Sequence, residues 1–118
     1  TNQLAGKVIS TEPFTVATPA GNLFVTSDPE VNLPSGTPVM VLIPPTGAAL
    51  EQNDTDQNCI LGKVVDTVFL GEGFRIELAL PSGEILVFSL HSAVPKGEML
   101  SLYFNRNQLI CLPITDSM

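Results

Sequence analysis

The sequence predicts an all-β protein, a small barrel or sandwich that arose by internal duplication. Three observations support this: short segments alternate apolar and polar residues, turn-forming residues separate them, and short motifs recur in the same order. No segment keeps apolar residues at the i, i+3, i+4, i+7 spacing of an amphipathic helix for three turns, so we expect little helix. Many short strands separated by turns are typical of small barrels and sandwiches.

The clearest strand covers residues 74–80, where apolar side chains occupy every second position and Arg75 and Glu77 stand between them. This alternation indicates a strand with one buried face. Pro81 and Gly83 then supply a turn into a second strand, which completes a β-hairpin. The same reasoning predicts strands over residues 7–10, 15–18, 23–26, 39–43, 61–69, 85–90, 99–104 and 109–112.

A motif of the form Asn-x-x-x-Gly-Lys-Val occurs twice, first from Asn2 and again from Asn58, at an offset of 56 residues. Two Pro-x-Gly turns follow each copy, at offsets of 62 and 61 residues. The rise in offset places a six-residue insertion in the second copy, around residues 66–73. Landmarks in a constant order are typical of duplication. The paired turns are residues 18–22 with 80–84, and 33–36 with 94–97.

The duplication divides the chain into a first repeat over residues 1–50, a linker over residues 51–57 and a second repeat over residues 58–118. The linker contains three carboxylates and no apolar side chain, which is typical of a solvated connection. Each repeat is at or below the ~60 residues at which an isolated domain is already marginal. We therefore expect the copies to share a core or to exchange strands, either with each other or between subunits, and we expect a homodimer.

The composition excludes several classes of partner. The chain has 118 residues, a net charge of −7 and only five Lys and Arg residues, so binding to a nucleic-acid backbone is not expected. Charged residues make up 14%, well below the usual ~25%, and no apolar stretch is long enough to cross a membrane as a helix. One Tyr, six Phe and no Trp also disfavour sugar or oligonucleotide binding by stacking.

No known catalytic, phosphate-binding or metal-binding motif is present, so we expect no enzymatic activity, catalytic residue, cofactor or metal site in this chain. His91 is the single imidazole and is interpreted as an exposed residue at a loop edge. Asp54 and Asp56 lack the Gly and the terminal Glu of a calcium loop. Cys59 and Cys111 are either two reduced, small apolar residues or a disulfide pair.

The repeated motif supplies the candidate ligand-binding residues Asn2, Lys7, Asn58 and Lys63. A lysine at an equivalent place in each copy could hold an anion, with backbone amides contributing at a subunit interface. The alternative is structural, because the glycine before each lysine permits a close backbone approach while the lysine itself points to solvent.

The second repeat resembles the TOBE domain, the C-terminal domain of ATP-binding subunits in ABC importers. The resemblance rests on Gly62-Lys63-Val64 after Asn58, on Pro81-Ser82-Gly83-Glu84, on Val94-Pro95-Lys96-Gly97 and on a closing strand before Pro113. The first repeat is similar more loosely. There, Ile43-Pro44-Pro45 stands where many members have an apolar strand that ends in Arg-Pro-Glu.

The resemblance implies tandem OB-like β-barrels at the C-terminus of a longer subunit whose ATPase activity lies in a preceding nucleotide-binding domain. It also implies a cytoplasmic location, peripheral to the inner membrane. The expected partners are that nucleotide-binding domain, through it the membrane-spanning permease, and the twin subunit. The implied function is a non-catalytic regulatory and dimerisation domain that senses the transported solute.

The start of the first repeat, from Asn2 to Val8, is also similar to the related molybdate-binding Mop domain. Members of that family carry Ser-Ala-Arg before the motif. Before Asn58 this chain has Thr55-Asp56-Gln57, whose carboxylate would repel an oxyanion. The alternative function is therefore a Mop-like domain that binds an oxyanion of the molybdate or tungstate type.

Overall fold

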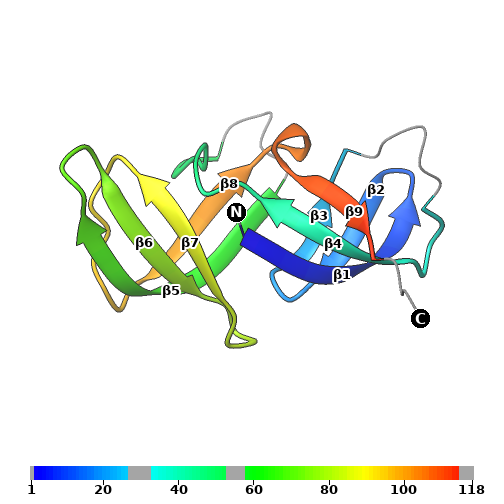
Figure 1. Ribbon diagram of the computed structural model, residues 1–118, viewed down its shortest axis with the longest axis horizontal. Coiled ribbons are helices and arrows are strands. Elements are labelled where there is room, and N and C mark those ends of the chain that lie inside the picture. Colours follow the sequence, from blue (N-terminus) through cyan, green and yellow to red (C-terminus); the bar gives the residue numbers. More distant parts are fainter. Residues whose placement is uncertain (1, 27–32, 53–57, 115–118) are drawn as a thin grey trace.

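The computed structural model describes residues 2–26, 33–52 and 58–114, and these form an all-β structure of two curled sheets that lie side by side (Figure 1). One sheet has the order β3-β2-β1-β4-β9 and the other has the order β7-β6-β5-β8. The described residues also contain one short 3-10 helix, η1 (Arg106–Gln108), and none of their helices is long and apolar enough to span a membrane. The strands are β1 (Asn2–Thr11), β2 (Phe14–Thr18), β3 (Gly21–Phe24), β4 (Pro38–Ile43), β5 (Asn58–Phe69), β6 (Phe74–Ala79), β7 (Ile85–Leu90), β8 (Met99–Phe104) and β9 (Ile110–Pro113).

Every segment predicted to be a strand contributes to one of these nine, although the ends differ. β1 and β5 begin several residues earlier than the alternation indicated, at Asn2 and Asn58. They do so because the antiparallel register carries them to the ends of β4 and β8, where Asn2 pairs with Ile43 and Asn58 with Phe104. Of the expected linker, residues 53–57 lie outside the described part of the chain.

The two sheets repeat the same topology, as the duplication predicts. In each, a long strand pairs with the following strand and with the fourth, and its ladder shifts at an equivalent place, between Val8 and Ser10 in β1 and between Val64 and Asp66 in β5. The inserted residues lengthen the β5–β6 hairpin, which extends out to the pair of Phe69 with Phe74.

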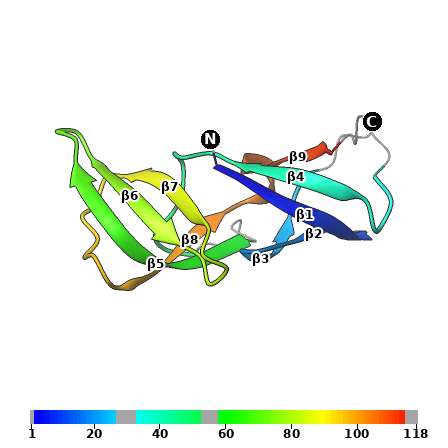
Figure 2. The same ribbon diagram turned by 60° about the horizontal axis from the view of Figure 1, so that its bottom comes forward.

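The two halves exchange strands within the chain. β9, at the end of the second repeat, pairs with β4 of the first, and the two views agree on this placement (Figures 1 and 2). In return, Ala49 forms an antiparallel bridge to Tyr103 in β8. Since β9 completes the sheet of the first repeat, that repeat does not form its full sheet alone, whereas the four strands of the other sheet all come from the second repeat. The boundaries drawn at residues 50 and 58 stay a prediction.

A contiguous apolar core links the inward faces of both sheets. Its largest side chains include Phe88 and Phe104, whose rings lie 5.8 Å apart between centroids. Cys59 and Cys111 are both free thiols, and they lie on strands of different sheets, so the disulfide alternative is not formed. Burial raises the pKa of the Cys111 thiol, which favours its neutral form.

Candidate functional site

The two repeated asparagines hold the halves together. The Asn58 Nδ2 donates to the carbonyl of Phe24 at 2.8 Å, and the Phe24 N–H donates to Asn58 Oδ1 at 2.6 Å. The same pair of bonds joins Asn2 to Val87, each at 2.8 Å. Each side chain thus reaches from the start of its own sheet to the edge strand of the other, β3 or β7. Both asparagines are buried, with exposed fractions of 8% for Asn2 and 2% for Asn58.

A carboxamide suits this position because it carries a donor and an acceptor side by side, as a peptide group does. The Asn side chains therefore pair with strand edges whose N–H and C=O groups would otherwise lie unpaired in a partly buried place. The contacts are reciprocal, so the duplication yields a pseudo-twofold joint between the halves. The ligand-binding role of Asn2 and Asn58 stays a prediction, and the structure assigns their amide groups a structural one.

The two candidate lysines lie away from this joint. Lys7 and Lys63 are exposed, and they point to the opposite face of β1 and β5 from the buried asparagines. Five residues of strand separate Asn and Lys in each repeat, which corresponds to about 17 Å. The structure therefore does not bring the two residue types of one repeat together. Among the described residues, no carboxylate forms a salt bridge with either lysine.

The glycine before each lysine lies against the neighbouring strand. A Cβ at Gly62 would lie 2.7 Å from the carbonyl oxygen of Ala79, and one at Gly6 would lie 2.6 Å from that of Ala17. These distances leave no room for a side chain. The structural interpretation of the repeated Gly-Lys motif therefore accounts for its glycine, while the exposed lysine remains available for a ligand.

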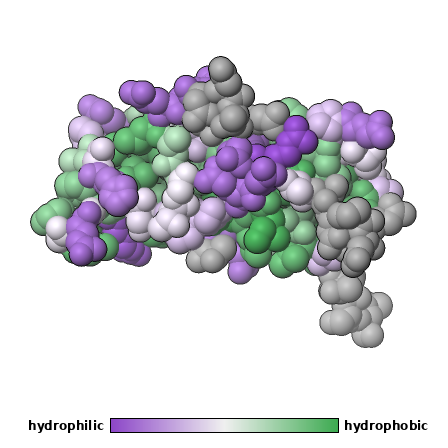
Figure 3. All heavy atoms as spheres, turned by 90° about the horizontal axis from the view of Figure 1, so that it is seen from above, coloured by the Kyte–Doolittle hydropathy of each residue, from purple (hydrophilic) through white to green (hydrophobic). Residues whose placement is uncertain are grey.

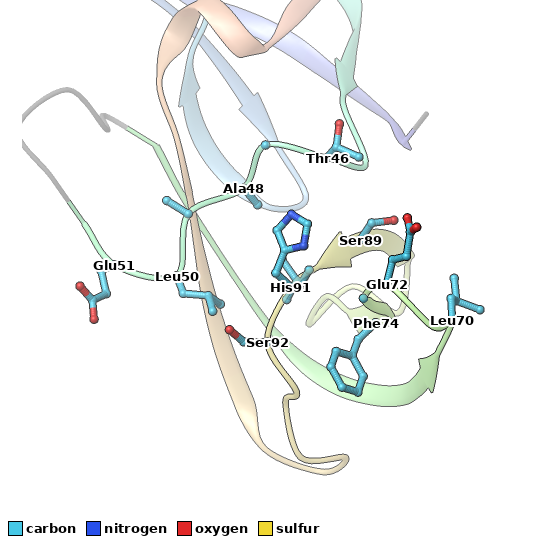
Figure 4. Close-up of a pocket in the computed structure, with 14 residues that line it drawn as sticks. Thr46, Ala48, Leu50, Glu51, Leu70, Glu72, Phe74, Ser89, His91 and Ser92 are labelled. Atoms are coloured by element: carbon cyan, nitrogen blue, oxygen red, sulfur yellow. The ribbon is translucent and has the colours of Figure 1, made fainter.

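A pocket of about 820 Å³ opens in the second half of the molecule (Figure 4). Its walls come from residues 46–51, from the inserted hairpin turn with Phe74 that follows it, and from residues 89–92 at the end of β7. The volume lies within the usual range for sites that hold small molecules. The side chains that line it are both apolar and polar, as is common in such sites.

The pocket lies beside a seam at which the two halves differ in one bridge. In the first half, Thr26 forms a parallel bridge with Ile110, and its Oγ1 donates to Asn107 Oδ1 at 2.8 Å. By the repeat correspondence, Ser89 and Ala49 are the equivalents of Thr26 and Ile110. Ser89 N–H does donate to the Pro45 carbonyl at 2.7 Å, but within the described residues no bridge joins Ser89 to Ala49.

None of the predicted ligand-binding residues Asn2, Lys7, Asn58 and Lys63 lines this pocket. His91 is exposed, as interpreted, and it lies at the pocket with Glu72 and Ser92. The one feature of the sequence that pointed to this place was the insertion in the second repeat. It supplies one wall of the pocket and has no counterpart in the first repeat. Among the described residues, no group of three His, Cys, Asp or Glu side chains is arranged to hold a metal ion.

No protein-family model matches this chain, and no curated protein matches its sequence. Among solved structures, it is similar to the cytoplasmic molybdate-binding protein ModG, in a crystal form with molybdate bound. The TM-score is 0.80, the sequence identity is 14%, and the alignment covers 96% of each chain. At this identity the likeness concerns the fold. The chain therefore has the OB-like all-β fold of ModG over nearly its whole length.

Proposed function

We propose that this chain is a non-catalytic domain that binds a small oxyanion of the molybdate or tungstate type. The observation that carries the proposal is the match to molybdate-binding ModG, which includes both repeats and nearly all of each chain. The same observation favours the Mop-like alternative over the ABC importer function. A cytoplasmic location accompanies the proposal.

The residues proposed to attract the anion are Lys7 and Lys63. Each is exposed, is repeated by the duplication and has no carboxylate partner among the described residues. An ammonium group forms charge-assisted hydrogen bonds with oxyanions, and backbone amides of a neighbouring copy would supply further donors at a subunit interface. With a net charge of −7 the molecule as a whole repels anions, so the site needs such a local cation.

Isothermal titration calorimetry with molybdate, tungstate and sulfate tests this function. We expect heat of binding with molybdate and tungstate, and a loss of affinity of about tenfold in the variants Lys7→Ala and Lys63→Ala, since each removes one charge-assisted contact. Lys96→Ala, which changes an exposed lysine in a turn of the second repeat, is the matched control and should leave binding unchanged. Absence of heat at millimolar anion would refute the proposal.

A second candidate is the regulatory and dimerisation domain of an ABC importer subunit. It is favoured by apolar side chains exposed at the end of the β5–β6 hairpin, where Phe69 and Leu70 are 64% and 61% exposed. Apolar side chains also reach the surface elsewhere in the molecule (Figure 3). Contiguous exposed apolar side chains mark surfaces that pack against other proteins. In this function the hairpin would contact the twin subunit, and the nucleotide-binding domain and permease would be further partners.

Light scattering after size exclusion tests the homodimer. At micromolar concentration we expect twice the chain mass of 12.6 kDa, and a return to the single mass in Phe69→Ser, because the serine removes apolar surface from the contact. Ile9→Ser changes a 44% exposed apolar residue of the other sheet and should stay dimeric. A mass of 12.6 kDa for the unaltered chain contradicts the dimer and removes the donors expected from a neighbouring copy, so that an oxyanion would then be held by the lysines of a single chain.

A further inference from the structure

We propose that the pocket of the second half binds a small organic cation with an apolar body, of the kind represented by an aromatic amine. This site is separate from the lysines of the proposed oxyanion function and does not depend on them. The apolar lining of the pocket and its charged side chains support this proposal.

The pocket lies at a place where the described parts of the two repeats differ. Its wall at Leu70 and Glu72 belongs to the insertion that the first repeat lacks, and its opposite wall is the segment exchanged from the first repeat. In the first half, the bridge between Thr26 and Ile110 closes the corresponding seam. Within the described residues, the second copy thus lacks the bridge found in the first and carries an added wall.

The charged side chains of the pocket favour a cation. Glu51, Glu72 and His91 line it, and among the described residues that line it there is neither Lys nor Arg. In the close-up, the Glu72 carboxylate lies beside Ser89, and the Phe74 ring points away from it (Figure 4). An ammonium group can pair with the Glu72 carboxylate, and an apolar body attached to it can cover apolar side chains of the lining. The net charge of −7 adds to this attraction at long range.

The apolar lining determines the rest of the ligand. Leu90 is buried at the pocket, and Leu50 and Leu70 contribute partly exposed apolar surface. The Phe74 ring packs against the ring of Phe69, with 5.2 Å between their centroids. A ring or short alkyl body would cover this surface, since removal of apolar area from water is favourable. A compact inorganic anion such as molybdate would find neither charge nor shape complementarity here.

Three small probes that each carry a phenyl group but differ in charge test the proposal. Phenethylammonium, 2-phenylethanol and 3-phenylpropionate are titrated into the ¹⁵N-labelled full chain, and amide shifts are followed by NMR. We expect phenethylammonium to shift amides of residues 47–51, 72–74 and 89–92. We expect it to bind about tenfold more tightly than the carboxylate, with the alcohol between them. The preference should weaken as salt is added.

Two variants locate the site. Glu72→Gln should weaken phenethylammonium binding about threefold, which is the usual contribution of an exposed ion pair. Glu84→Gln is the control, because Glu84 is exposed and lies outside the pocket lining. Ser92→Trp should block the pocket from an exposed position and abolish the shifts. Equal binding of the ammonium and carboxylate probes, shifts outside the pocket, no shifts at millimolar probe, or equal effects of the two Gln variants would each overturn the proposal.

Discussion

Gly62→Ala is expected to lower the free energy of unfolding by about 3 kcal/mol, near the upper end of the usual cost of overpacking. The added Cβ would lie 2.6 Å from Leu78 Cγ and 2.7 Å from the carbonyl oxygen of Ala79. The leucine side chain can move in part, but the carbonyl belongs to the ladder between β5 and β6 and can move only if the strands separate. Urea denaturation followed by circular dichroism measures the change.

The repeat provides a second test of the same argument. Gly6→Ala should cost a similar amount, because its Cβ would lie 2.6 Å from the carbonyl oxygen of Ala17 and 2.7 Å from Val16 Cγ1. The control is Leu61→Ala, which changes the residue before Gly62 on the exposed face and should stay within about 0.5 kcal/mol. Unfolding curves of the two glycine variants that coincide with that of the unaltered chain would show that the strands relax freely at these positions.

Asn58→Ala is expected to cost about 2–3 kcal/mol of unfolding free energy. The alanine removes both hydrogen bonds to Phe24 and leaves its N–H and C=O unpaired in a partly buried place. Asn2→Ala should have a similar but smaller effect, since Asn2 is the more exposed of the two. Chemical denaturation measures both. Asn22→Ala changes an exposed asparagine of β3 and serves as the control.

Asn58→Asp separates a hydrogen-bonding role from a purely steric one. The carboxylate matches the asparagine in shape and can still accept from the Phe24 N–H, but it cannot donate to the Phe24 carbonyl. It also places a charge in a buried position. We therefore expect Asn58→Asp to be destabilised at neutral pH. A variant as stable as the unaltered chain would contradict the role of the amide as a paired donor and acceptor.

Local pattern predicted most of the fold. In a strand with one buried face, apolar and polar residues alternate. Segments such as residues 74–80 can therefore be predicted as strands without knowing which strands they pair with. The repeated turns and the Asn-x-x-x-Gly-Lys-Val motif predicted the duplication, and the two sheets share their topology. The strand ends were predicted less well, because β1 and β5 extend over residues whose pairing with β4 and β8 is remote in sequence.

The candidate site was harder to predict. The motif drew attention to Asn2 and Asn58 as anion ligands, yet their amides bond backbone groups 85 and 34 residues away. No local pattern contains those partners. Lys7 and Lys63 were predicted from the same repeated motif. Both are exposed and therefore remain available as ligands of the proposed oxyanion. The pocket at His91 could not be predicted from the sequence, because its walls come from three separate segments.

The sequence by itself determined the β class, the strand segments and the duplication, since side-chain alternation and repeated turns are local properties of the chain. Only the tertiary structure decided how the copies join. The exchange of β9 for the segment at Ala49, the reciprocal asparagine contacts and the seam beside Ser89 all depend on pairs far apart in sequence. The two repeats therefore share their topology but differ at this seam, where Thr26 bridges Ile110 and, among the described residues, no bridge joins Ser89 to Ala49, because edge pairing is satisfied only in three dimensions.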